Sequence, residues 1–107
     1  MPFFRLLFVL MFLCNVNFSS ASGFDEGYEA YQAGDNVIAL SKIMPLAEEG
    51  ESKAQFFVGF IYDNDDTLPD NRREAIKWYT KAAEQGVPLA QYRLGEFYAS
   101  GEVVSEH

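Results

Sequence analysis

The chain has 107 residues, of which 49% are hydrophobic and 22% charged, a composition typical of one small globular domain. Sixteen acidic residues against eight basic ones give a formal net charge of −8, and a chain this acidic is repelled by nucleic acid and by anionic lipid. The sequence therefore argues against nucleic-acid partners and favours basic or neutral ones.

Residues 1–21 have the pattern of a cleaved signal peptide. Arg5 precedes an unbroken apolar run over residues 6–14, and small residues end at Ala21, where a signal peptidase would cut. The run is too short for a stable bilayer-spanning helix, and an uncleaved N-terminal anchor is the alternative. Cleavage removes Cys14, the only cysteine, and leaves seven basic residues against sixteen acidic ones, a net charge of −9. We predict a secreted or periplasmic protein without disulfides and without a membrane span after cleavage.

An internal repeat organises the rest of the chain. Residues 47–62 recur at residues 83–98, an offset of 36, and Ala, Glu, Gly, Ala, Gln, Gly and Tyr fall on themselves. Apolar character persists where identity does not, since Val58 falls on Leu94. A period in the mid-thirties with a glycine at the joint is typical of stacked helical hairpins.

The first helix is expected over residues 24–33. Phe24, Tyr28 and Tyr31 are spaced by four and three residues, which places them on one helical face. Gly34 then ends this helix.

A second helix is expected over residues 37–48, with either Asp35 or Asn36 as its N-cap. Pro45 removes one hydrogen bond and should bend this helix without breaking it. Gly50 supplies the left-handed residue that closes the unit. The apolar stripe is expected to comprise Ile38, Leu40, Ile43, Met44, Leu46 and Ala47.

The second unit, residues 51–86, is expected to hold a helix from Ser52 to Tyr62, a polar loop over residues 63–70 and a further helix. Asn71 and Glu74 have the spacing of a capping box, so the further helix should begin there and continue to about Gln85. Its Trp78 and Tyr79 are predicted to lie in the core.

The third unit, residues 87–107, contains one helix from about Leu89 and no second helix. Leu94, Phe97 and Tyr98 would then have an uncovered side, although stacked repeats need a polar outer face at their ends. Three explanations are open: the sequence is a fragment, the uncovered side pairs with another chain through self-association, or the half-unit is itself the cap.

This repeat pattern resembles the Sel1-like repeat family, relatives of the tetratricopeptide arrays. The most specific part is the stretch from Trp78 to Gly86, and the resemblance covers roughly residues 24–101. It implies an all-α fold, a right-handed α-solenoid of antiparallel helix pairs with about two and a half repeats over residues 24–50, 51–86 and 87–107, acting as a scaffold for protein or peptide binding. The residues that carry the signature are Ala54, Gly59, Tyr62, Trp78, Tyr79, Ala82, Ala83, Gly86, Ala90, Gly95 and Tyr98.

The repeat offset also identifies a candidate binding surface. Phe57 and Phe60 stand where the third unit has charged residues, so in a symmetric array they would form an exposed apolar patch on the concave helices. The alternative is that both pack against Tyr28 and Tyr31 of the preceding helix. The candidate partner-binding residues are Phe57, Phe60, Tyr92, Arg93 and Glu96.

The residues offer no constellation for catalysis or metal binding. The serines have no base at a recognisable spacing. The loop from Asp63 to Asp66 has several oxygen ligands, but Leu68 occupies the position where a calcium loop needs glycine. We predict no catalytic residue, no metal and no cofactor.

Two other functions deserve comparison with peptide binding. A glycan or cell-wall binder would use aromatic rings exposed in a row, whereas most rings here fall on core stripes. A β-lactamase-like enzyme would resemble the cysteine-rich members of the repeat superfamily, but this chain has no cysteine after the leader.

Overall fold

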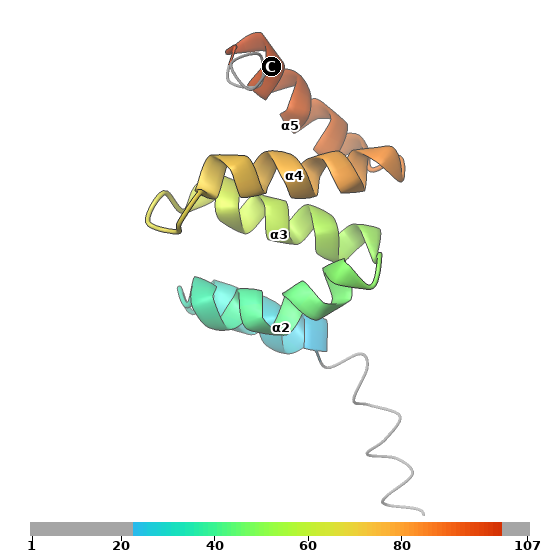
Figure 1. Ribbon diagram of the computed structural model, residues 1–107. Coiled ribbons are helices and arrows are strands. Elements are labelled where there is room, and N and C mark those ends of the chain that lie inside the picture. Colours follow the sequence, from blue (N-terminus) through green and yellow to red (C-terminus); the bar gives the residue numbers. More distant parts are fainter. Residues whose placement is uncertain (1–22, 102–107) are drawn as a thin grey trace, which may run out of the picture.

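Figure 1 shows a computed structural model in which helices follow one another in a stack. The structure describes residues 23–101, so the predicted signal peptide at 1–21 and the end of the third unit lie outside the described residues. Within this range there is no strand, and none of the helices combines the length and apolar character needed to cross a bilayer. The helices are a first one over residues 23–32, α2 (Asn36–Glu48), α3 (Ser52–Asn64), α4 (Asn71–Glu84) and α5 (Pro88–Ala99).

Successive helices pack in the order of the chain. Helix α3 packs against both α2 and α4, and α5 packs against α4. The two ends of the described chain lie at opposite ends of the stack, as expected for a solenoid. The predicted all-α solenoid is confirmed.

The same turn closes the first two units. Gly50 has φ +104° and Gly86 has φ +89°, a left-handed conformation that glycine adopts without a Cβ clash. In each turn the next amide donates to the carbonyl five residues earlier, from Glu51 to Leu46 and from Val87 to Ala82, at 3.2 Å in both cases. The repeat in sequence is thus also a repeat in hydrogen bonding.

The cap of α2 is Asp35, whose Oδ1 accepts a hydrogen bond from the Ile38 amide at 3.1 Å. Asn36 has a different role, because its Nδ2 donates to Asp65 Oδ2 at 2.9 Å and ties the first unit to the loop of the second. Helix α2 continues through Pro45 without interruption, as predicted.

Two local expectations were wrong. Ile38 is 47% exposed, because the buried stripe of α2 runs through Ala39, Ile43 and Ala47 at four-residue spacing. The capping box of α4 does not form either. Asp70 occupies the cap position at φ 52°, and its side chain makes no capping hydrogen bond. The side-chain Nδ2 of Asn71 donates instead to the Tyr62 carbonyl of α3 at 3.1 Å.

Helix α4 contributes to both halves of the core. Trp78 lies in a cluster with buried residues of α2 and α3, whereas the adjacent Tyr79 lies in a second cluster with Ala90 of α5. Both side chains are buried, as predicted, at 4% and 0% exposure. Neighbouring residues on a helix point in directions about 100° apart, so one helix can fill both clusters.

The close approach of α3 and α4 depends on Gly59. A Cβ placed on Gly59 would lie 2.8 Å from Cδ1 of Tyr79, well inside van der Waals contact. The equivalent glycine of α5, Gly95, has no described atom within 4 Å of such a Cβ. Gly95 belongs to the repeat signature, but no described residue packs closely against it as Tyr79 packs against Gly59.

A glutamine hydrogen bond also recurs at the repeat offset. Gln55 Nε2 donates to the Ala47 carbonyl at 3.2 Å, and Gln91 Nε2 donates to the Ala83 carbonyl at 3.3 Å. Gln85 then joins the two units, since its Nε2 donates to Gln55 Oε1 at 2.8 Å. The Gln55 and Gln91 bonds thus add a side-chain donor to carbonyls at the ends of α2 and α4, which also accept the amides of Gly50 at 3.1 Å and Gly86 at 2.9 Å.

We expect Gly59→Ala to destabilise the fold by about 1–2 kcal/mol. Overpacking against Tyr79 costs about 1–3 kcal/mol, and the better helix propensity of alanine offsets up to about 1 kcal/mol. The matched control is Gly95→Ala, which should stabilise the fold by about 0.5–1 kcal/mol because its Cβ meets no described atom. Urea unfolding followed by far-UV circular dichroism measures both. Equal effects of the two substitutions would show that Tyr79 does not press on Gly59.

Candidate binding surface

An aromatic cluster joins the first helix to α3. Phe57 lies at its centre, with ring centroids 5.6 Å from Phe24, 5.6 Å from Tyr28 and 5.1 Å from Tyr31. Phe60 lies 6.0 Å from Tyr31. Packing against the tyrosines, one of the two arrangements considered from the sequence, is the one present. Both phenylalanines are half-buried.

A hollow of about 340 Å³ lies beside this cluster and is lined by Phe24, Asp25, Tyr28, Lys53 and Phe57. The ammonium of Lys53 lies 4.3 Å from the centroid of the Phe24 ring, within cation–π range. Tyr28 is 40% exposed at the rim. The hollow thus combines apolar rings with one acid and one base.

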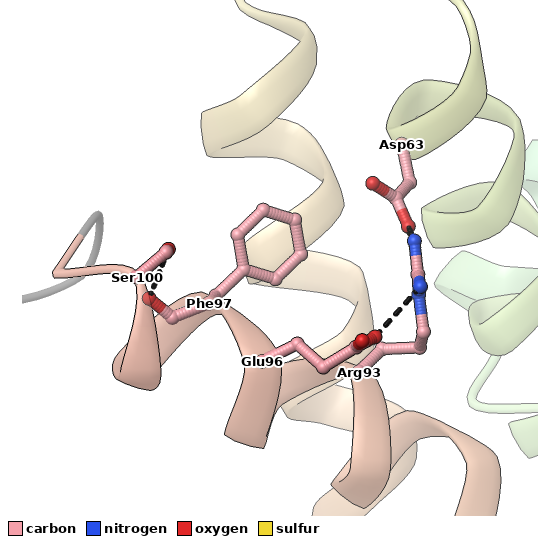
Figure 2. Close-up of a pocket in the computed structure, with 5 residues that line it drawn as sticks. All are labelled: Asp63, Arg93, Glu96, Phe97 and Ser100. Carbon is pink, nitrogen blue, oxygen red and sulfur yellow. Dashed lines mark hydrogen bonds and ion pairs between the residues drawn. The ribbon is translucent and has the colours of Figure 1, made fainter.

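A second hollow, of about 250 Å³, lies between the end of α3 and the length of α5 (Figure 2). Its lining residues are Asp63, Arg93, Glu96, Phe97 and Ser100. We call it the polar groove. Figure 2 shows the Arg93 side chain of α5 extending to Asp63 of α3, with Glu96 on its other side.

The carboxylate of Asp63 organises the polar groove. Its Oδ2 accepts a hydrogen bond from the Tyr79 hydroxyl at 2.9 Å and one from Arg93 Nε at 3.0 Å, and it also pairs with Arg93 Nη2. Arg93 Nη1 pairs with Glu96 Oε1 at 2.7 Å. Asp63 therefore links α3, α4 and α5 through one oxygen atom.

These contacts reinforce the ordinary ionisation states of Tyr79 and Arg93. Burial raises the pKa of the Tyr79 hydroxyl, and the negative charge of Asp63 raises it further. The hydrogen bond to Asp63 raises the pKa of the Arg93 guanidinium. Tyr79 is thus neutral and Arg93 cationic at physiological pH. With Arg93 between the carboxylates of Asp63 and Glu96, the groove has a surplus of one negative charge.

The structure brings only some of the candidate residues together. Arg93 and Glu96 line the polar groove, while Phe57 and Phe60 lie in the aromatic cluster. Tyr92 lines neither hollow and is 65% exposed on α5. Whether these residues contact a partner stays a prediction.

The sequence did not identify Asp63 as a site residue. It was assigned to the polar loop, but α3 continues to Asn64 and holds Asp63 within its last turn. Arg93 is 30 residues away, and the repeat-equivalent position holds Ala99, so neither local spacing nor the repeat connects the two.

Asp65, in the loop after α3, accepts hydrogen bonds both from within the loop and from α2. Asp65 Oδ1 accepts hydrogen bonds from the Thr67 amide at 3.0 Å and from its hydroxyl at 2.5 Å, and Oδ2 accepts the bond from Asn36. The Asn36 bond is the main reason that the pKa of Asp65 is lowered. Residues 23–101 contain no cluster of three or more acidic, histidine or cysteine side chains that could hold a metal ion.

Comparisons with known proteins agree on one family for this chain. The Sel1 repeat model matches residues 52–87 and 88–105, about half of the chain. A putative Sel1-like repeat-containing protein of Acanthamoeba polyphaga mimivirus is 32% identical over 68 residues, which cover 60% of this chain and 13% of that protein. An F-box protein of Arabidopsis thaliana is 31% identical over 80 residues, which cover 75% of this chain and 22% of that protein.

Two solved structures share the fold. A protective antigen of uropathogenic Escherichia coli that displays an SLR fold has a TM-score of 0.67 and 36% identity, covering 76% of this chain and 18% of the antigen. A Sel1 repeat protein from Oxalobacter formigenes has a TM-score of 0.63 and 28% identity, covering 83% of this chain and 74% of that protein. The chain spans less than a quarter of the length of the two curated relatives.

The pKa of Tyr79 predicts how stability changes at alkaline pH. Its pKa is raised above the ordinary value of 10.0 in the folded chain, so above about pH 10 the unfolded chain releases a proton that the folded chain keeps. Stability is therefore full below that pH and falls as the pH rises, by at most about 1.4 kcal/mol per unit for this group. Tyr79→Phe should show a shallower decline than the wild type between about pH 8 and about pH 11.

The substitution also removes the hydroxyl bond to Asp63, so at neutral pH Tyr79→Phe should be less stable than the wild type by about 1–2 kcal/mol. Urea unfolding at a series of pH values measures both effects, with the exposed Tyr92→Phe as the control that should follow the wild type. Parallel curves for the wild type and Tyr79→Phe would contradict the assignment.

Proposed function

Because the chain belongs to the Sel1 repeat family, whose repeats generally mediate protein–protein interactions, we propose that it is a secreted or periplasmic scaffold for peptide binding. The partner is a basic or neutral peptide segment. It lies along the concave face made by the first helix, α3 and α5.

The main support for this proposal is the set of helices that supply the lining residues of the two hollows. The first is lined only by residues of the first helix and α3, and the polar groove only by α3, α5 and the C-cap Ser100. Neither α2 nor α4 contributes a lining residue. Alternate helices of a solenoid form one face, so both hollows open along one continuous surface with α3 at its centre.

The chemistry of that surface suits a mixed apolar and cationic segment. Half-buried rings such as Phe57 offer apolar contact area at low entropic cost. Asp25 and Glu96 offer carboxylates to cationic side chains at either end, and the net charge of −8 increases the rate of encounter with basic segments.

Export through the leader is part of the proposal. The pattern of residues 1–21 supports cleavage after Ala21. N-terminal sequencing of the protein isolated from its native host should find Ser22 as the first residue. An intact Met1 would overturn cleavage of the leader and favour the uncleaved N-terminal anchor.

Glycan binding and catalysis have less support. Tyr28, Tyr92 and Tyr98 are exposed, but they are divided between the first helix and α5 and do not line one hollow. Sel1 repeats typically form non-catalytic scaffolds, and we propose the same of this chain.

Photocrosslinking can test the binding face. A photoreactive phenylalanine at position 28 or 96 lies at the rim of each hollow, where Tyr28 is 40% exposed and the Glu96 side chain 48% exposed. Position 37 is the control, because Val37 is 69% exposed on α2. In the native host we expect the same partner to be captured from 28 and 96 but not from 37.

A charge reversal then tests the chemistry of the partner. Asp25→Lys combined with Glu96→Lys should abolish capture from position 28, whereas Glu48→Lys on the exposed side of α2 should leave it unchanged. Capture that is equal from all three positions, or unaffected by the double reversal, would overturn the proposed face.

A further inference from the structure

The contact between α3 and α4 shows how the second helix of a repeat packs against the first. The ring of Tyr79 lies 5.6 Å from that of Phe56, its Cδ1 lies 2.8 Å from the position of a Cβ on Gly59, and its hydroxyl donates to Asp63 at 2.9 Å. The glycine makes room for the ring, and the residues on either side hold it.

The equivalent residues of α5 form the same surface without an occupant. Tyr92 stands at the position of Phe56, Gly95 at that of Gly59 and Ala99 at that of Asp63. All three are exposed, and Tyr98, the equivalent of the half-buried Tyr62, is 54% exposed. We call these four residues of α5 the α5 face.

Gly95 has no explanation within the described chain. Its backbone is not in the left-handed region, and no described atom lies within 4 Å of a Cβ at this position. A glycine inside an exposed helix weakens that helix relative to alanine. In α3 the same residue is explained by the ring that it admits.

We propose that the α5 face is a docking surface for a basic amphipathic helix of a partner protein, with an aromatic ring seated on Gly95. The surface is separate from the two hollows, so the inference is independent of the peptide-binding proposal. Its evidence is the interface that already exists between α3 and α4, which is related to the α5 face by the repeat.

Helix α4 indicates the chemistry of the occupant. Its basic residues outnumber its acidic ones by four to two, and it packs in a chain with a net charge of −8. Small residues, Ala75 and Ala82, flank Tyr79 at four and three residues and allow close approach. Charge complementarity favours the same basic character in a helix that covers α5.

One difference from α3 defines the preferred ring. Asp63 accepts the Tyr79 hydroxyl in α3, whereas Ala99 offers no acceptor in α5. A hydroxyl buried without a partner is unfavourable. The α5 face should therefore accept phenylalanine at least as well as tyrosine.

A peptide taken from the chain itself provides the probe. It has the sequence of residues 71–85 with Tyr79→Phe, and its binding to the full chain is measured by fluorescence anisotropy. We expect saturable binding that weakens about tenfold or more when the probe instead carries Tyr79→Ala.

Variants of the protein locate the site. Gly95→Leu should weaken binding of the phenylalanine probe about tenfold or more. Thermal unfolding should show that this variant remains folded, since a Cβ at this position meets no described atom. Glu48→Leu on α2 is the matched control and should bind like the wild type. NMR shifts on adding the probe should centre on Tyr92, Gly95 and Tyr98.

Other outcomes would overturn the proposal. Shifts centred on Asp25 or Arg93 would place the probe in the hollows, and shifts centred on Gly59 would mean that it displaces α4. Sedimentation showing a dimer that Gly95→Leu dissociates would assign the α5 face to a second copy. Nuclear Overhauser effects from residues 102–107 to Gly95 would assign it to the chain itself.

Discussion

The packing of the Tyr79 ring against Gly59 is the contact on which the rest of the structure depends. It determines how closely α4 approaches α3, because the ring lies where any Cβ on Gly59 would be. The same side chain shares a core cluster with Ala90 of α5, its ring lies 6.3 Å from that of Phe97, and its hydroxyl donates to Asp63 at 2.9 Å. The α3–α4 interface, the α4–α5 interface and the position of Asp63 in the polar groove thus all depend on Tyr79.

Asp63 extends this contact to the surface. Its carboxylate is nearly buried, with 11% of the side chain exposed, and would be unfavourable there without the Tyr79 and Arg93 donors. The pairing holds Arg93 across the groove, and Arg93 in turn holds Glu96. A structural bond between helices therefore also fixes the charged groups available to a partner, so changes in packing and in binding are coupled at this residue.

The sequence predicted the features of the fold that follow from local patterns. The turns at Gly50 and Gly86 follow from the 36-residue repeat, and the burial of Trp78 and Tyr79 follows from the apolar side of α4. The pairing of Asp63 with Arg93 was missed because it occurs once, between residues 30 apart with no repeated counterpart. The cap of α4 was missed because Asn71 bonds to another helix, which local spacing cannot reveal.

Some departures from the repeat fall on the candidate binding surface. Residues conserved between the two units, such as Gln55 and Gln91, make the same bonds in both and hold the array. Among the positions that differ is the pair where α3 presents Phe57 and α5 presents Arg93, and these two side chains line the two hollows. One backbone repeat therefore carries an aromatic surface on one helix and a charged surface on the next. A repeat protein can evolve a composite binding face in this way without altering the contacts that stack its helices.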